Sequence, residues 1–411
     1  MIGESTVLQN INPITLHRIM MLLFSITRIA ILILHFLLFS YFVNVATAQE
    51  QRVINYEDLD ELNVEVIIDT KDQEGVYSVN LRNLVVTSGG TLLVSDLGKT
   101  TIEQYNYEGK FIEQIASEGQ GPGELPFIFN LFITEGDTLI VWHEQTGRAD
   151  YFYFDSDGIY KYVWSVMMDQ FPSHRLEVIG YTDNGKFFAY TGHTDAALIS
   201  SGMPEYRNTP VALLNESLKV HRDSLHMVKK PSYILADPSQ FHSPVTIGGL
   251  AILGMPPYRY EDYFILLNQG RYMIARPGTS NLYFYTSNHE LEKKVSIHAK
   301  DRRVERKDLQ YAFRDHRLRN DLRIIRKLES YVKEKKPPFL NVWASENHIL
   351  LHTDNGEKGK EMAIFTKHGK AVGKFYLSEY DEVHNFNHNR IYVLHKNPIA
   401  GHSIRIYRIN F

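Results

Sequence analysis

Three glycines and an acidic residue stand close together in one short segment, Gly119-Gln120-Gly121-Pro122-Gly123-Glu124. Closely spaced glycines let successive backbone N–H groups converge, which is the geometry of an anion-binding nest. The segment lacks the Lys-Ser/Thr pair of a P-loop and opens no helix, so nucleotide binding is excluded. The favoured alternative is a tight crossover between strands, in which Pro122 fixes φ and the glycines take strained angles. Glu118, Gln120 and Glu124 remain candidate ligand-binding residues.

Histidines are frequent toward the C-terminus and could act as metal ligands or general bases. No H-E-x-x-H segment occurs, and the spacings match no zinc signature. No G-x-S-x-G elbow is present, so a hydrolase triad has no support. We therefore assign no catalytic residue and interpret the histidines as loop and surface residues: His348, His352, His368, His384, His388, His395 and His402.

The element that must position these residues is a repeat of short strands. Residues Asn83–Val94 are matched by Asn130–Val141 and by Asn341–Leu351, each an apolar strand, a polar turn and a second apolar strand. A recurrence of about 40–50 residues built from short strands is typical of a β-propeller. The fold class is therefore all-β, and we count six blades.

Turns and closing strands support this count. Inner hairpin turns are predicted at Gly89-Gly90, Glu135-Gly136-Asp137, Asp183-Asn184-Gly185, Asn268-Gln269-Gly270, Glu346-Asn347 and His388-Asn389. Outer turns are predicted at Tyr107–Lys110, Asp155–Gly158, Asn215–Ser217, Asn288–Glu290 and Lys367–Gly369. The strand Val64–Ile68 precedes the first repeat and is expected to complete the last blade, beside Ser403–Ile409.

Two stretches interrupt the blades. Pro231–Tyr258 is rich in Pro, Gly and Ser and is predicted to be a loop. Residues 301–336 lack strand alternation and predict one or two amphipathic helices between blades 4 and 5, ended by Pro337-Pro338. The apolar residues at helical spacing are Leu318, Leu322, Ile325, Leu328 and Val332. The insert is basic, but interspersed carboxylates favour a solvated face over nucleic-acid or membrane binding.

The Gly-x-Gly-Pro-Gly-Glu segment, and the helical insert followed by Lys336-Pro337-Pro338-Phe339, resemble a group of exported bacterial six-bladed β-propeller proteins. This group is related to NHL- and TolB-like propellers, and the resemblance covers most of residues 60–411. It implies export and a binding or scaffold role, and it carries over no catalytic residue.

Some propellers related to this group are lyases or calcium-dependent lactonases with a metal near the central channel. Asn83, Asn130 and Asn341 stand at corresponding places of three repeats, with Asn385 as a fourth, and oxygen ligands around one axis suit calcium. Carboxylates are missing from the same position, so we favour asparagines that cap strand backbones or bind water. We expect no cofactor, with calcium as the alternative and the metal unknown.

An apolar run, Ile29–Val43, follows Arg28 and ends in Ala46-Thr47-Ala48. This pattern predicts a secretory signal peptide over residues 1–48, cleaved after Ala48, with Met20 or Met21 as alternative starts. The alternative is an uncleaved membrane anchor over Leu22–Val43. The chain is thus expected to be periplasmic, on the outer surface or secreted, with residues 49–411 forming the propeller.

The chain has no cysteine and a formal net charge of −4, so neither disulfides nor a general attraction to nucleic acid are expected. We predict a monomeric binding module for a protein, peptide or glycan ligand, seated on the face of the blade-to-blade loops. A metal-dependent lyase or lactonase at the channel mouth and a membrane-anchored envelope scaffold are the alternatives. An enzyme is the less favoured class.

Overall fold

The structure is a computed structural model. It describes residues 52–55, 59–72, 79–126, 129–144, 146–168, 175–182, 185–193, 207–230, 234–236, 246–247, 250–254, 258–299, 301–313, 329–330, 332–387 and 389–411, with Met21, Ile31, His35 and Arg326. The chain divides into two units, Met1–Glu50 and Gln51–Phe411. Only three residues of the first unit are described, so the predicted signal peptide lies outside the described residues. Within the described part of the chain, no helix is long and apolar enough to cross a membrane.

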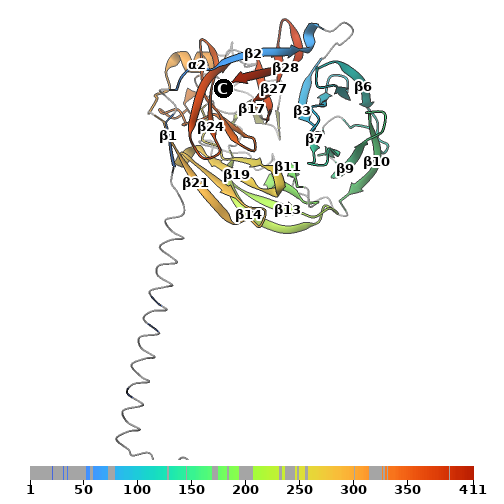
Figure 1. Ribbon diagram of the computed structural model, residues 1–411, viewed down its shortest axis with the longest axis horizontal. Coiled ribbons are helices and arrows are strands. Elements are labelled where there is room, and N and C mark those ends of the chain that lie inside the picture. The colour runs from blue at the N-terminus through green and yellow to red at the C-terminus, as the bar shows by residue number, and fades with distance from the viewer. Residues whose placement is uncertain are drawn as a thin grey trace, which may run out of the picture. The chain divides into compact units, whose positions relative to one another are not determined.

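Six antiparallel sheets form the blades of a ring (Figure 1). Blade 1 contains β3 (Leu81–Val86), β4 (Leu92–Asp96), β5 (Thr101–Tyr105) and β6 (Phe111–Ala116), and blade 2 contains β7 (Asn130–Ile133), β8 (Leu139–His143), β9 (Arg148–Phe154) and β10 (Tyr160–Met167). Blade 3 contains β11 (Arg175–Tyr181), β12 (Phe187–His193), β13 (Arg207–Leu214) and β14 (Val220–Lys230). The predicted all-β fold with six blades is confirmed.

The second half of the ring repeats this order from the axis outward. Blade 4 contains β18 (Tyr263–Leu266), β19 (Tyr272–Arg276), β20 (Asn281–Tyr285) and β21 (Leu291–His298), and blade 5 contains β22 (Asn341–Ala344), β23 (His348–Gly356), β24 (Gly359–Thr366) and β25 (Ala371–Leu377). Blade 6 contains β26 (Asp381–Asn387), β27 (Arg390–Asn397), β28 (Gly401–Asn410) and, as its outer strand, β2 (Asn63–Asp69). The predicted closing strand is therefore confirmed.

The N-terminal segment also joins three blades, and we call residues 52–55 and 59–69 the N-terminal strap. β1 (Arg52–Asn55) pairs in parallel with β21 of blade 4. Leu62 then donates its backbone N–H to the Lys374 carbonyl of blade 5 at 2.7 Å. β2 finally pairs with β28 in blade 6. Because each contact covers an outer strand, the strap protects strand edges as well as closing the ring.

The core consists of six apolar clusters, each between two neighbouring blades. The middle strands of the blades are packed on both faces, so all five residues of β4 and of β8 are buried. Double burial explains why these strands begin with unbroken apolar runs, 92–94 and 139–142, rather than alternating apolar and polar residues.

The described hairpin turns join the strands at the expected places, while Asp183, Asn184 and His388 of two predicted turns lie outside the described residues. Thr87, Thr134 and Thr182 each begin an inner turn and accept a backbone N–H on their Oγ1 atom, at 2.9, 2.9 and 3.2 Å. We call the side of the ring that holds these turns the turn face. We call the opposite side, where one blade leads into the next, the crossover face.

The first of the two predicted insertions differs from the expectation. The predicted loop over Pro231–Tyr258 contains a small sheet of β15 (Ile234–Ala236), β16 (Thr246–Ile247) and β17 (Leu250–Gly254), so the loop prediction is wrong there. Gly248-Gly249 between apolar residues is a hairpin signal that outweighs the overall composition. Short 3₁₀ helices η1 (Thr70–Asp72), η4 (Asn268–Gly270) and η5 (Pro277–Thr279) lie in connections.

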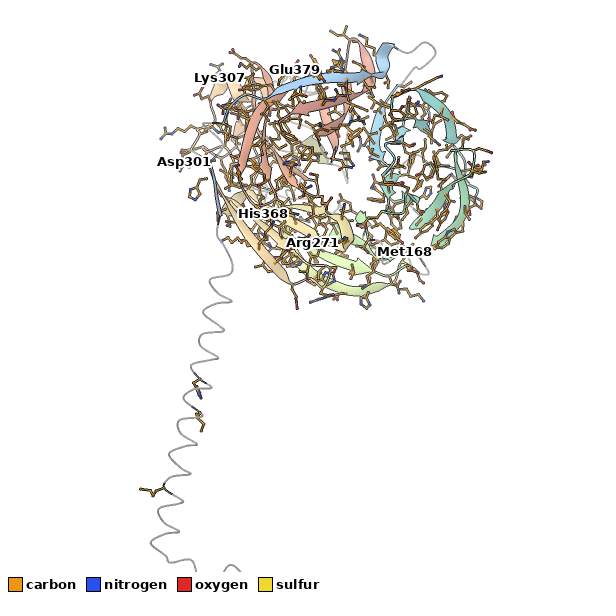
Figure 2. All side chains as sticks on the ribbon, viewed as in Figure 1. Met168, Arg271, Asp301, Lys307, His368 and Glu379 are labelled. Atoms are coloured by element: carbon orange, nitrogen blue, oxygen red, sulfur yellow. The ribbon has the colours of Figure 1, made fainter. Side chains whose placement is uncertain are left out.

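The insert between blades 4 and 5 holds helix α2 (Arg306–Phe313), while most of residues 314–331 lie outside the described residues. The two ends of the insert pair with each other: Val304 donates to the Glu334 carbonyl and Lys336 donates to the Arg302 carbonyl, both at 2.8 Å. Asp301 and Lys307 mark the insert at the outer edge of the ring (Figure 2). The two ends of the insert therefore lie side by side where it leaves and rejoins the propeller.

Candidate functional site

The central channel opens on the turn face into a cavity of about 460 Å³. All six inner strands or their turns contribute to its wall, and the residues are Val86, Thr87, Ser88, Ile133, Thr134, Glu135, Asp137, Tyr181, Thr182, Leu266, Leu267, Asn268, Gly270, Ala344, Ser345, Glu346, Asn385, Phe386 and Asn387. Most of the hydroxyl and carboxylate groups belong to the turns, whereas the amides of Asn385 and Asn387 belong to β26, and the apolar residues lie at or next to the strand ends. A concave site with convergent polar groups is the general form of a ligand site.

The carboxylates of this cavity differ in their surroundings. Asp137 accepts hydrogen bonds from the backbone N–H and the hydroxyl of Ser88, at 2.7 and 2.6 Å, and so links blades 1 and 2. Glu135 accepts a hydrogen bond from the backbone N–H of Gln269 in blade 4. Glu346 has no hydrogen-bond or ion-pair partner among the described residues. No lysine or arginine is among the described residues that line the cavity, so its wall has a net negative charge.

A second pocket, of about 320 Å³, continues the cavity between blades 5 and 6. It shares Ser345, Glu346 and Asn387 with the channel mouth. Its outer end is formed by His348 and Phe411, whose rings stack with centroids 5.0 Å apart and planes at 18°. Burial lowers the pKa of His348, so this ring is neutral at pH 7.

A third pocket, of about 340 Å³, lies between blades 2 and 3, and we call it the aromatic pocket. Its lining is Thr134, Gly136, Thr138, Tyr151, Tyr153, Trp164, Tyr181 and Glu216, and Thr134 and Tyr181 also line the channel mouth. The three pockets therefore form one groove across the turn face, from blades 2 and 3 through the channel mouth to blades 5 and 6.

A β-bulge determines where Trp164 points. The register of β9 and β10 shifts between Tyr162, opposite Phe152, and Trp164, opposite Tyr151. Without the bulge, Trp164 would share the face of Tyr162, which packs toward blade 1. The shift turns Trp164 toward blade 3, where it stacks on Tyr151 with centroids 4.1 Å apart and planes at 9°. Bulges that re-aim a side chain are frequent at functional sites.

Glu216 enters the aromatic pocket from the outer turn of blade 3. A Cβ atom on Gly185, whose φ is +76°, would lie 1.9 Å from Oε1 of Glu216. The glycine therefore leaves the space in which this carboxylate lies. Glu216 has no hydrogen-bond or ion-pair partner among the described residues, and its charge is one of the influences that raise the pKa of the buried Tyr151, after burial itself.

The glycine-rich segment forms a crossover from blade 1 to blade 2 on the crossover face. Gly121 donates its backbone N–H to Oε2 of Glu124 at 2.8 Å. Arg148 donates to the carbonyls of Gln120 and Glu124 at 3.2 and 2.7 Å. The predicted nest therefore surrounds a carboxylate of the chain itself. Glu118 takes part only in a backbone bridge with Leu125 in the described structure, and its side chain is exposed.

The three predicted asparagines lie on inner strands of blades 1, 2 and 5. Asn83 donates to the Phe129 carbonyl at 3.2 Å, and Asn130 donates to Oε1 of Glu144 at 2.6 Å. Asn341 accepts the backbone N–H of Val342 at 2.8 Å. Asn385 instead lines the cavity on the turn face. Within the described residues, no three His, Asp or Glu side chains form a group that could hold a metal ion.

Two buried His–Asp pairs lie inside blades. In blade 2, His143 Nε2 is 2.8 Å from Asp150 Oδ2, and Ser165 donates to Asp150 Oδ1 at 2.6 Å. The serine and the histidine both contact the aspartate rather than each other, so the group is not a nucleophile–base pair. Burial lowers the pKa of His143; for Asp150 burial acts upward, but the hydrogen bonds of His143 and Ser165 bring its pKa below the usual value.

The second pair, in blade 6, belongs to the closure of the ring. His395 Nδ1 is 2.7 Å from Asp381 Oδ1, and Tyr407 donates to Asp381 Oδ2 at 2.6 Å. Arg405 contacts both His395 and Asp69 of the strap. These polar groups have their partners inside the blades, as buried polar groups require. The interpretation of His395 as a loop or surface residue is therefore wrong, because it lies buried in β27.

The chain is similar to several solved structures at low sequence identity. No family model matches the chain, and no curated protein matches it. Among solved structures it is similar to a Bacteroides fragilis protein described as exported, with 10% identity, a TM-score of 0.47 and coverage of 87% of this chain and 100% of that chain. A duf4221 family member from Bacteroides vulgatus has 10% identity, a TM-score of 0.47 and coverage of 86% and 99%.

A virginiamycin B lyase from Staphylococcus aureus is also similar, with 10% identity, a TM-score of 0.42 and coverage of 85% and 100%. Similarity at these levels carries no argument about activity, so the six-bladed ring is taken from the sheets themselves. Their arrangement fits the six-bladed β-propeller fold that the sequence predicts.

Proposed function

We propose that this protein is an extracytoplasmic binding module whose ligand lies in the groove of the turn face. The observation that supports this is the continuity of the three pockets, because shared residues join the channel mouth to a pocket on each side. A groove that crosses the ring suits an extended ligand, such as a peptide or a glycan chain, better than a compact metabolite.

The polar groups of the two faces favour the turn face. On the crossover face, Glu124, Arg148 and the asparagines Asn83 and Asn130 have partners within the protein. On the turn face, Glu346 and Glu216 have no protein partner among the described residues. Glu346 and Glu216 are exposed and line concave sites, so they can contact a ligand directly, and the turn face is therefore the better candidate. The extracytoplasmic part of the proposal depends on the predicted signal peptide.

The test is a screen of the purified full chain on peptide and oligosaccharide arrays with two matched double variants. One carries Glu346→Ala and Asn387→Ala on the turn face, and the other carries Glu118→Ala and Gln120→Ala on the crossover face. We expect the turn-face variant to lose the captured ligands and the crossover-face variant to keep them. The opposite pattern would place the ligand on the crossover face and refute the proposal.

The lyase or lactonase alternative is separated by thermal unfolding with calcium, with zinc and with EDTA. A ligand that binds only the folded state stabilises it. A melting temperature that falls in EDTA and recovers with one ion would support a metal site and the enzyme. A melting temperature that is the same in all three conditions would give the metal-dependent enzyme no support.

A further inference from the structure

The aromatic pocket combines electron-rich rings with a carboxylate. Tyr153 and Trp164 are 45% and 40% exposed, and one face of the Trp164 ring stacks on Tyr151. Glu216 stands at the same pocket without a partner among the described residues. The hydroxyls of Thr134 and Thr138 complete the polar side of the wall.

Among the described residues that line the aromatic pocket, the charged one is Glu216. Aromatic faces carry negative electrostatic potential, and a cation near such a face is attracted to it. Among the described residues that line the aromatic pocket and the channel mouth, none is lysine or arginine. An acidic ligand would be repelled by the carboxylates of Glu216 and Glu346, so phosphates and uronic acids are disfavoured.

We infer that the aromatic pocket binds a cationic side chain, the guanidinium or ammonium group of a basic peptide segment that continues into the channel mouth. The inference rests on the proposed function of the turn face. The planar guanidinium stacks on the open face of Trp164, as Arg does on aromatic rings, while Glu216 accepts its N–H groups. Glu135 and Glu346 then lie along the path of the following basic residues.

A neutral sugar ring is the main competitor for such a surface, because it can also stack on an exposed aromatic ring. A sugar hydroxyl can also donate to Glu216, but a neutral ring gains no charge attraction from the carboxylate. A cation uses both features of the pocket, the aromatic face and Glu216.

The experiment is a fluorescence titration of the purified full chain with an acetylated and amidated triarginine peptide. The matched probe is the tricitrulline peptide, which has the same shape without the charge, and maltohexaose serves as the neutral glycan. Trp164 is the exposed reporter in the wild type and in Glu216→Gln, because Trp142 is fully buried and Trp343 is half-buried, and isothermal titration calorimetry measures the affinity of Trp164→Leu. The variants are Trp164→Leu and Glu216→Gln.

We expect the triarginine peptide to bind and the tricitrulline peptide to bind at least about tenfold more weakly. Each variant should weaken triarginine binding by about threefold or more. Raising ionic strength from about 0.01 M to about 1 M, which shortens the Debye length from about 30 Å to about 3 Å, should weaken it in the wild type and less in Glu216→Gln.

Equal binding of both peptides, binding of maltohexaose alone, or no binding at all overturns the inference. Circular dichroism and melting temperature establish that the variants are folded. If array ligands depend on Glu346 and Asn387 but not on Trp164, the inference fails and the proposed function of the turn face stands. If the array ligands depend neither on Glu346 and Asn387 nor on Trp164, the inference and the proposed function both fail.

Discussion

Gly121 donates its backbone N–H to Oε2 of Glu124 at 2.8 Å, so the anion inside the glycine-rich turn is a side chain of the turn itself. Gly119 packs against the same carboxylate, since a Cβ atom there would lie 2.0 Å from Oε2 and 2.8 Å from Cβ of Glu124. The spacing of these residues is therefore explained by one folded-back glutamate. Arg148 then fastens the turn to blade 2 through two of its carbonyls.

The first prediction concerns this turn. Gly119→Ala should destabilise the protein by about 1–3 kcal/mol, because the new methyl group displaces Glu124 from a filled space. The matched control is Gly278→Ala, since a Cβ atom there would meet nothing within 4 Å. The control should be neutral or stabilise by up to about 1 kcal/mol. Urea unfolding of both variants measures the difference, and an equal effect would contradict our account of the turn.

The second prediction compares two arginines of β28 that contact the strap. Arg405 donates to Asp69 at 2.6 Å, its Nη1 lies 2.9 Å from Nδ1 of His395, and it lies near the fully buried Asp381. Arg405→Ala should cost about 2–4 kcal/mol, because it leaves half-buried and buried carboxylates without their cation. Chemical denaturation monitored by circular dichroism gives the value.

Arg408 is the control for this comparison. It forms an exposed ion pair with Glu65 at 3.1 Å on the same two strands. Arg408→Ala should change stability by less than about 0.5 kcal/mol. If both variants lost the same stability, the network from Asp69 to Asp381 would have no special part in closing the ring.

The blades could be predicted from the sequence for a physical reason. Their middle strands are buried on both faces, so they contain unbroken apolar runs, as at 92–94 and 139–142. The closing strand was also predictable, because Asn63–Asp69 precedes the first repeat and has no partner nearby in the sequence.

The aromatic pocket could not be predicted in the same way. Its geometry depends on the bulge before Trp164, and regular alternation in the sequence would place this residue on the face of Tyr162. Glu216 reaches the pocket from a turn of the next blade, beside Gly185. The one available signal was the recurrence of Thr87, Thr134 and Thr182 at the start of inner turns, which marks the wall of the channel mouth.

The third prediction concerns the base of the insert. Lys336 contacts Asp308 of α2 at 2.9 Å and Asp354 of blade 5 at 2.8 Å, with all three side chains largely buried. Lys336→Met should release α2, because Asp308 loses its cation in a poorly solvated place. Amide exchange in α2 should be at least about tenfold faster, measured by mass spectrometry.

Lys307→Ala is the matched control on the same helix. Its side chain is 73% exposed and pairs only with the exposed Glu305 among the described contacts. Exchange in α2 should be nearly unchanged in this variant. A variant Lys336→Met with wild-type exchange would show that apolar packing, not this ion cluster, holds the helix.

The last prediction is a pH dependence of stability centred on His352. Its Nε2 atom lies 3.0 Å from the Asp354 carbonyl and 3.0 Å from Oδ1 of Asn355, so the neutral ring with a proton on Nε2 fits this place. Burial, together with the charge of Lys360, lowers the pKa of His352 to about 3. The usual pKa in an unfolded chain is about 6.5. Between these values the unfolded state binds a proton that the folded state does not bind.

Stability from His352 is therefore fully present above about pH 6.5 and is lost as the pH falls toward about 3, at up to about 1.4 kcal/mol per pH unit. His352→Gln keeps a donor near the Nε2 position but cannot be protonated, so it should reduce the pH dependence by about this amount. The exposed His368 provides the control, and His368→Gln should keep the wild-type slope. Urea unfolding at several pH values between about 6 and about 4 measures the slopes. A variant His352→Gln with the wild-type slope would mean that His352 is protonated in the folded state as readily as in the unfolded chain.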